Sequence, residues 1–183
     1  MKSTFQILLG AGAIIGLLGC ATHGKSKQGQ VTVYYGRAVL QPTKGSQTTG
    51  QVWFSEAFGK VKVEAQVTGL DPNSTHGVHI HEFGDCTAPD ATSAGGHYNP
   101  QAHQHGAPDA EARHVGDMGN LKTDKKGNAT LSLELNNASI NGILNPIIGR
   151  AVIVHKNPDD LISQPTGGAG PRIACGVIGA STK

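Results

Sequence analysis

The chain has 183 residues and a formal net charge of +2 at pH 7, so it fits one domain of ordinary size and offers no basic surface that would indicate a nucleic acid partner. Glycine is abundant, with 26 residues, while aromatic residues make up only 4% of the chain. This composition favours many short strands and turns over long helices.

The N-terminal segment has the pattern of an export signal. Lys2 precedes an apolar stretch, residues 5–18, that is too short to span a bilayer. The stretch ends in LLGC at Cys20, which resembles the lipobox of bacterial lipoproteins, where the cysteine becomes the lipidated N-terminus. An ordinary signal peptide with a nearby cleavage site is the alternative. We expect residues 1–19 to be a signal peptide, Cys20 to be lipidated, and the protein to be anchored by its lipid at the periplasmic face of a bacterial cell envelope.

Residues 20–30 form the next segment, and the domain is expected to span residues 31–183. The polar, basic stretch ATHGKSKQGQ has no apolar period that could pack, which predicts a flexible tether. Strand-like runs follow, and KVKVEAQV and TLSLELN alternate polar and apolar residues. Eight short strands separated by turn formers predict an all-β sandwich or barrel. The predicted strands are residues 31–40, 50–56, 60–68, 77–82, 119–123, 129–135, 150–155 and 173–178.

Two long segments interrupt the strands, at residues 83–118 and 156–172. Both are rich in Gly, Pro and Asp, and the first is also rich in His. Loops of this length are usually functional, and bound metal could supply the order that secondary structure does not.

Histidine is concentrated in one part of the chain, because seven of the nine histidines lie within residues 76–114. Imidazole nitrogen suits copper and zinc, and a carboxylate added to imidazoles is a common zinc arrangement. His79 and His81 leave the same face of a predicted strand, while Ile80 points into the core. Residue types and order therefore predict ligands for two metal ions: His79, His81, His97, His105, His114, Asp117 and His155.

Two other histidines are less well determined. Spacing alone would let either His103 or His105 reach a zinc ion. His76 lies just before a predicted strand and is interpreted as a surface residue.

Seven motifs occur together in the chain: HIHEFGDC, TSAGGHYNP, HGAP, RHVGDMGNL, IIGRAVIVH, DDL and GAGPRIACGVIG. In this order they closely resemble the copper/zinc superoxide dismutase family, from about residue 31 to 179. The resemblance implies an eight-stranded Greek-key β-barrel with two long functional loops. It also implies copper and zinc as cofactors and superoxide as the substrate, disproportionated to dioxygen and hydrogen peroxide.

The resemblance assigns roles to individual residues. The motif HGAP selects His105 over His103 as a zinc ligand. His97 would be shared by both metals and would carry a proton during catalysis. The other implied roles are copper ligands His79, His81, His97 and His155; zinc ligands His97, His105, His114 and Asp117; Asp159 as a hydrogen-bond partner of His79 and His105; Arg172 as the cation that attracts and orients superoxide; and Thr166 in the channel wall.

The three cysteines leave one odd thiol in an exported protein. Lipidation would consume Cys20, which leaves Cys86 and Cys175 to pair. Such a bridge would stabilise the fold by roughly 4 to 5 kcal/mol in the chain-entropy model. It requires an oxidising compartment.

Some features depart from the family or leave alternatives open. Only LISQP separates Asp160 from Thr166, whereas the family's eukaryotic members carry a longer loop with charged residues here. The charges that attract superoxide must therefore differ in this chain. Lys156 is a candidate to replace the missing positive charge. A homodimer is possible, but the motifs do not identify an interface. A non-catalytic metal-binding lipoprotein and a purely structural envelope protein are the rival functions.

Overall fold

The computed structural model describes residues 32–182. The predicted signal peptide, Cys20 and the tether lie outside these residues. Within residues 32–182, no helix has the length and apolarity needed to cross a membrane.

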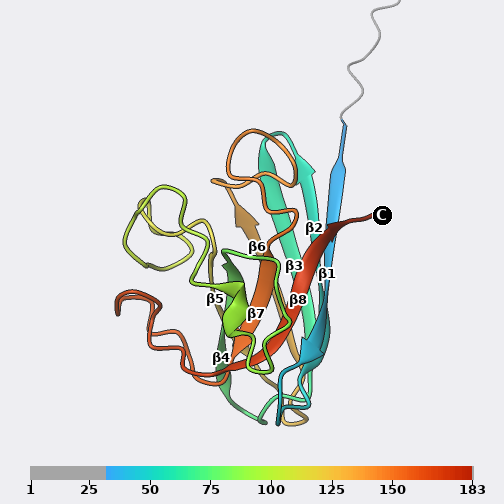
Figure 1. The fold of residues 1–183 in the computed structure, drawn as a ribbon, viewed down its shortest axis with the longest axis vertical. Coiled ribbons are helices and arrows are strands. Elements are labelled where there is room, and N and C mark those ends of the chain that lie inside the picture. The colour runs from blue at the N-terminus through green and yellow to red at the C-terminus, as the bar shows by residue number, and fades with distance from the viewer. Residues whose placement is uncertain (1–31, 183) are drawn as a thin grey trace, which may run out of the picture. The chain divides into compact units, whose positions relative to one another are not determined.

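The described chain is built from eight strands and one short 3-10 turn (Figure 1). Every predicted strand is present, with ends that shift by a few residues. In β3 the alternation of the sequence becomes strict alternation of exposed and buried side chains, as expected for a strand with one face on the core. The elements are β1 (Tyr34–Pro42), β2 (Thr49–Ala57), β3 (Lys60–Thr68), β4 (Thr75–His81), η1 (Thr92–Ala94), β5 (Asp117–Lys122), β6 (Ala129–Leu135), β7 (Ala151–His155) and β8 (Arg172–Ala180).

The strands form one antiparallel sheet in the order β5-β4-β7-β8-β1-β2-β3-β6. The chain crosses from β3 to β4 and from β6 to β7, pairs that are not neighbours in the sheet, which is a Greek-key connection. A bridge between Thr123, directly after β5, and Ala129, the first residue of β6, links the two edge strands of the sheet. The result is a nearly closed barrel, as the sequence predicted.

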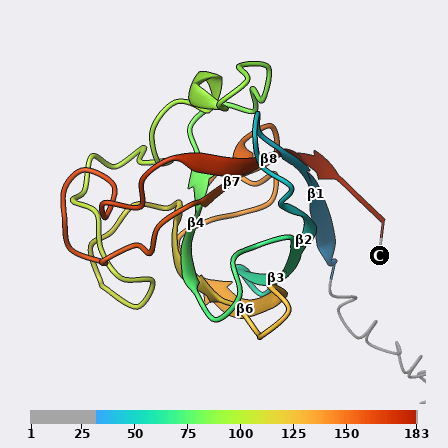
Figure 2. The ribbon, with the colours of Figure 1, turned by 90° about the horizontal axis from the view of Figure 1, so that it is seen from below.

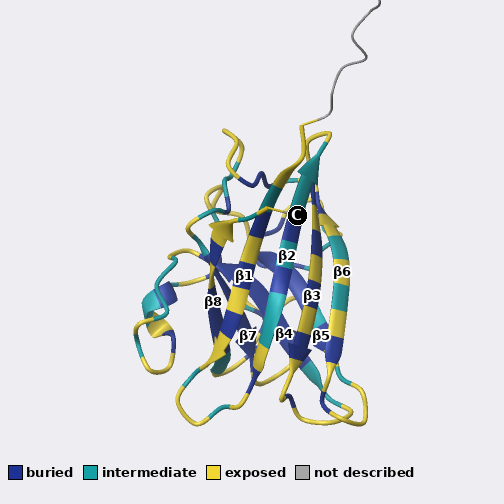
Figure 3. Cartoon of the chain, turned by 90° about the vertical axis from the view of Figure 1, so that its right-hand side faces the viewer, coloured by how far each residue is buried: buried dark blue, intermediate teal, exposed yellow. Residues whose placement is uncertain are grey.

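Apolar side chains fill the barrel, and Ile80 is fully buried there as predicted. The outer face of β4 is also buried, because His79 and His81 point away from the core and are still at most 1% exposed. The second long loop and residues 97–118 of the first gather on this side of the barrel, away from β1 and β2 (Figure 2). The earlier part of the first loop reaches the end of β1, where Pro89 accepts from the N–H of Lys44. Figure 3 shows the contrast with β1 and β3, whose exposed and buried residues alternate.

A disulfide joins the first long loop to the sheet. Cys86 and Cys175 are bonded, with their Cα atoms 5.8 Å apart and a sequence separation of 89. The predicted pairing is confirmed. The bridge holds the start of the loop against β8, close to the end of the sheet where Arg172 lies.

Candidate metal centre

Within residues 32–182, two groups of buried side chains could each hold a metal ion. In each group the candidate ligand atoms all lie within 4.8 Å of one another. The groups have the same members as the two predicted ligand sets: His79, His81, His97 and His155 in the first, and His97, His105, His114 and Asp117 in the second.

Backbone pairing brings these residues together from distant parts of the sequence. His79 on β4 pairs with Asp117 at the start of β5, and His81 forms a bridge with His97 in the first long loop. His155 ends β7, the other neighbour of β4. The barrel therefore supplies one side of the site, and the loop supplies the other.

His81 and His155 have their ring orientation fixed by main-chain carbonyls. His81 Nδ1 donates to the carbonyl of Gly95, and His155 Nδ1 donates to that of Gly170, both at 3.0 Å. This tautomer leaves each Nε2 with a free lone pair, and the two Nε2 atoms lie 3.2 Å apart. Two lone pairs facing each other repel unless a cation lies between them.

Asp159 orients one imidazole of each group. Its Oδ2 accepts from His79 Nε2 at 2.8 Å, and its Oδ1 accepts from His105 Nε2 at 2.9 Å, the two contacts that the sequence predicted. The Nδ1 lone pairs of both rings then point into the site. Asp159 is itself fixed by Asn120, whose amide bonds both the N–H and the carbonyl of Asp159 at 2.8 Å. The Asp159 carboxylate therefore does not belong to either ligand group, but it orients one ligand in each and so links the two groups.

His97 lies between the two groups. Its Nδ1 is 2.9 Å from Asp117 Oδ1, inside the second group, while its Nε2 faces the first. Among the described residues, His97 Nε2 and His79 Nδ1 are buried nitrogens without a hydrogen-bond partner. Unpaired buried polar atoms are rare and call for an explanation, and here both converge where a cation would accept their lone pairs. The donor set therefore fits a metal ion in the first group.

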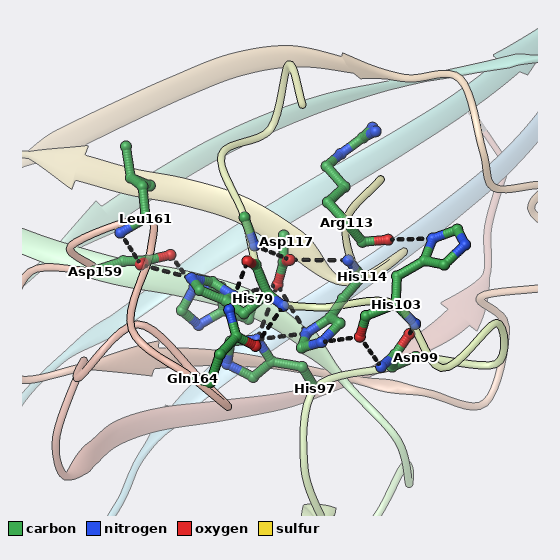
Figure 4. Close-up of polar contacts among 12 residues, drawn as sticks. His79, His97, Asn99, His103, Arg113, His114, Asp117, Asp159, Leu161 and Gln164 are labelled. Atoms are coloured by element: carbon green, nitrogen blue, oxygen red, sulfur yellow. Dashed lines mark hydrogen bonds and ion pairs between the residues drawn. The ribbon is translucent and has the colours of Figure 1, made fainter. Parts of the chain in front are cut away.

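The second group converges on one carboxylate oxygen (Figure 4). Asp117 Oδ1 lies 3.0 Å from His105 Nδ1 and 3.3 Å from His114 Nδ1. Asp117 Oδ2 accepts the main-chain N–H groups of Gly106 and His114, which fixes the carboxylate. Three nitrogens and one oxygen form a closed set that suits tetrahedral zinc.

The electrostatics of the site favour the protonation states that metal ligands need. Burial acts to raise the pKa of Asp117, but hydrogen bonds from His114 and His97 outweigh it and hold the pKa well below its usual range. Burial, followed by repulsion from neighbouring imidazoles, lowers the pKa of His79 and of His81. Burial also lowers the pKa of His155, to about 4. The carboxylate stays ionised and these imidazoles stay neutral at neutral pH, as metal binding requires.

These shifts predict that acid destabilises the metal-free protein. Between about pH 6.5 and pH 4 the unfolded chain protonates His155 and the folded chain does not, so the free energy of unfolding falls as pH falls. His155 alone should contribute a loss of about 3 kcal/mol between pH 7 and pH 4. Urea unfolding of chelator-treated protein at both pH values measures the loss, and His155→Asn should remove this share. An equal pH dependence in both proteins would contradict the prediction.

Arg172 begins β8 and lies beside the first group. Its guanidinium donates to the carbonyls of Ala91 and Gly95, at 2.5 and 2.6 Å. Gly95 also accepts from His81, so Arg172 is connected to a candidate ligand through one carbonyl. The guanidinium is only partly buried, which leaves its positive charge available to an approaching anion.

Sequence reasoning missed two residues that shape the site. Gly167 has a positive φ of 67°, and a Cβ there would lie 1.9 Å from Asp159 Oδ1 and 2.6 Å from His105 Nε2. Only glycine leaves room for that hydrogen bond. Gln164 accepts from the N–H of His105 and donates to its carbonyl. The segment QPTGG contained both residues, but only the fold shows that it packs against His105.

The interpretation of His76 as a surface residue is wrong. His76 is 1% exposed, and its ring bonds the carbonyl of His155 at 3.0 Å and the hydroxyl of Ser74 at 2.7 Å. The main chain after β7 continues beside β4 here, since the N–H of Gly77 donates to the carbonyl of Asn157. His76 therefore holds the main chain of a candidate ligand in place.

The remaining predicted residues lie as follows. His103 is exposed and outside both groups, and its carbonyl accepts from His114 Nε2 at 3.2 Å. Lys156 pairs on the surface with Asp71, so a carboxylate offsets the charge that had been considered as a substitute. Thr166 is partly exposed in the second loop next to Gly167. Its place in a channel wall stays a prediction.

Comparison with known proteins agrees with this geometry. A family model described as copper/zinc superoxide dismutase matches residues 48–178. The chain is 49% identical over 151 residues to a protein of Humicola lutea named superoxide dismutase (Cu-Zn), covering 78% of this chain and 97% of that protein. Proteins with the same name from Botryotinia fuckeliana and Paramecium bursaria Chlorella virus 1 are each 46% identical, covering 78% of this chain and 97% and 76% of their own lengths. The chain belongs to the copper/zinc superoxide dismutase family.

Proposed function

We propose that the two buried groups form one catalytic centre that disproportionates superoxide to dioxygen and hydrogen peroxide. Copper would be held by His79, His81, His97 and His155, and zinc by His97, His105, His114 and Asp117. The observation that carries the proposal is His97, whose two nitrogens face different groups and whose Nε2 has no other partner. The relatives named superoxide dismutase (Cu-Zn) support the same reaction for this chain.

The overall reaction converts two superoxide ions and two protons into one dioxygen and one hydrogen peroxide. Copper bound by the first group would supply the one-electron redox chemistry that this reaction needs. His97 Nε2 would take up a proton and pass it to the reduced oxygen species, which joins proton and electron supply at one ring. Arg172 would attract the anion and orient it by charge and hydrogen bonding. Asp159 would keep the rings of His79 and His105 in the tautomer that the metals require.

Replacing Arg172 with isoleucine tests the catalytic part of the proposal. We expect kcat/KM for superoxide to fall by about tenfold, because the local positive charge that concentrates the anion is lost. Bound copper and zinc should not change, and the rate should become less sensitive to salt. Arg37→Ile is the matched control, since it removes the same charge from an exposed position on β1. Loss of copper in Arg172→Ile would instead assign Arg172 a structural role through Gly95.

The rival of a non-catalytic metal binder makes a different prediction. Protein loaded with both metals should then bind them without removing superoxide. The complete set of ligands, together with Arg172 beside the copper group, favours catalysis.

We also propose that the protein acts outside the cytoplasm, anchored by a lipid on Cys20 at the periplasmic face of a bacterial envelope. The sequence LLGC after a short apolar stretch supports this, and the Cys86–Cys175 bridge suits an oxidising compartment. The enzyme would there remove superoxide before it reaches envelope components. Mass spectrometry of membrane-extracted protein tests the anchor, and an unmodified Cys20 would overturn it.

A further inference from the structure

Exposed apolar side chains gather at one end of the barrel. The pairs Tyr34 with Glu56 and Val61 with Leu135 place the start of β1, the β2–β3 turn and the loop after β6 at this same end, which is the top of Figure 1. Nine large apolar side chains are exposed among the described residues, and five belong to this end: Val33, Tyr34, Phe58, Ile143 and Leu144. We call these five residues the apolar end. Single exposed apolar residues are normal, but a gathering marks an interaction surface.

Ile143 and Leu144 form the tip of a loop whose base is well ordered. The N–H of Ile140 donates to Glu56 Oε2 at 2.6 Å, which fixes the loop to the end of β2. Within the loop, Ser139 Oγ donates to the carbonyl of Leu144 at 2.6 Å. The tip above this base is open to solvent, with Ile143 at 104% and Leu144 at 55% exposure. The two side chains are therefore held outward, and water contact with them is unfavourable until another surface covers them.

The chemistry of this loop fits a lipid surface. Residues 136–149 contain no ionisable side chain. The charged side chains next to the loop have partners: Glu56 accepts a hydrogen bond from the main chain of the loop, and Lys60 forms an ion pair with Glu134. Charged groups are costly to bring into a bilayer, whereas aliphatic and aromatic side chains enter its interface readily.

The apolar end is also where the path to the proposed anchor leaves the barrel. The described chain begins at Thr32, next to β1, and the residues from there back to Cys20 can span at most roughly 40 Å when fully extended. A lipid on Cys20 would keep this end within that distance of the bilayer. The second long loop lies on the side of the barrel, away from β1 (Figure 2), so contact at the apolar end leaves it facing water. The first long loop reaches the base of the tip loop, where Arg113 donates to Asn136 and Asn137.

We propose that the apolar end docks on the bilayer that holds the anchor, with Ile143 and Leu144 entering the headgroup region. The proposal rests on the lipid anchor proposed above. The lipid on Cys20 and the tip of the loop would then give the protein two contacts with the membrane, and two contacts bind a protein to a bilayer more firmly than either alone. Docking would also fix the orientation of the barrel, so that the metal centre opens along the membrane surface.

Tryptophan quenching by brominated lipid tests the contact. The chain has one tryptophan, so Trp53→Phe combined with Leu144→Trp places a single fluorophore at the tip. The full chain, processed in a bacterial host, is reconstituted into phosphatidylethanolamine and phosphatidylglycerol vesicles with brominated acyl chains. We expect the tip tryptophan to lose most of its fluorescence. The matched control, Trp53→Phe with Ile162→Trp, carries the fluorophore at another exposed apolar position, in the loop after β7, and should keep its fluorescence.

Membrane docking, the lipid anchor and catalysis can be tested separately. Mass spectrometry of the same vesicles reports the lipid on Cys20, and a superoxide assay reports catalysis. Lipidated protein with an unquenched tip would overturn docking and leave the anchor standing, whereas an unmodified Cys20 would overturn both. The alternative is that a second copy of the chain, and not the bilayer, covers the apolar end. Sedimentation of Cys20→Ser protein without vesicles tests this by measuring whether the protein is a dimer. A dimer that dissociates on Ile143→Ser with Leu144→Ser would make the tip a subunit interface and overturn the proposal.

Discussion

Replacing His155 with alanine should lower superoxide removal by at least about 100-fold while zinc stays bound, because this imidazole belongs to the copper group alone. His155 Nε2 faces His81 Nε2 at 3.2 Å, and its other nitrogen is held by Gly170. Its loss leaves three nitrogens for copper. Removing a residue that only hydrogen-bonds a metal ligand costs roughly 10- to 100-fold in metal affinity or activity. The loss of a ligand itself should therefore cost at least as much.

Metal content and superoxide removal are measured on the same loaded sample. His103→Ala is the matched control, because His103 is an exposed histidine outside both groups, whose carbonyl accepts from His114 and whose ring bonds the carbonyl of Arg113. It should retain both metals and full activity. Activity of His155→Ala equal to that of the native protein would contradict the copper assignment, and loss of zinc from it would show that the two groups collapse together.

Much of the fold could be predicted because its determinants are local. Alternation in residues 60–68 shows directly which side chains face the core, and turn formers mark the strand ends. The ligand positions could be predicted from the family motifs, although the residues alone left His103 and His105 undecided. The cysteine count pointed to the disulfide that the structure contains.

The features of the site that could not be predicted from the sequence depend on contacts between segments that are distant in the chain. The place of His76 just before the predicted strand suggests a surface residue, whereas β4 begins at Thr75 and the ring is buried against the carbonyl of His155 and the hydroxyl of Ser74. Gly167 matters only because Asp159 and His105 meet next to it. The amide of Asn120, which fixes Asp159, lies 39 residues away in sequence. No local pattern carries such information.

Replacing His97 with alanine should have the widest effect, since it removes a ligand from both groups at once. The side chain of His97 is 1% exposed, and its Nδ1 lies 2.9 Å from Asp117 Oδ1. Its loss leaves three donors for copper and three for zinc, so both metals should bind more weakly and superoxide removal should fall by at least about 100-fold. Without the ring, Asp117 also loses one of the hydrogen bonds that hold its pKa low.

The contrast between the two alanine variants identifies the shared ring. Zinc affinity, measured by competition with a chelator, should fall in His97→Ala and stay native in His155→Ala, whereas copper affinity should fall in both. Thermal unfolding of the zinc-loaded proteins gives a readout independent of catalysis, because a ligand that binds only the folded state stabilises it in proportion to the logarithm of its affinity. Native zinc affinity in His97→Ala would place this ring in the copper group alone. Coupling between the groups would then pass through Asp159, which bonds His79 in one group and His105 in the other.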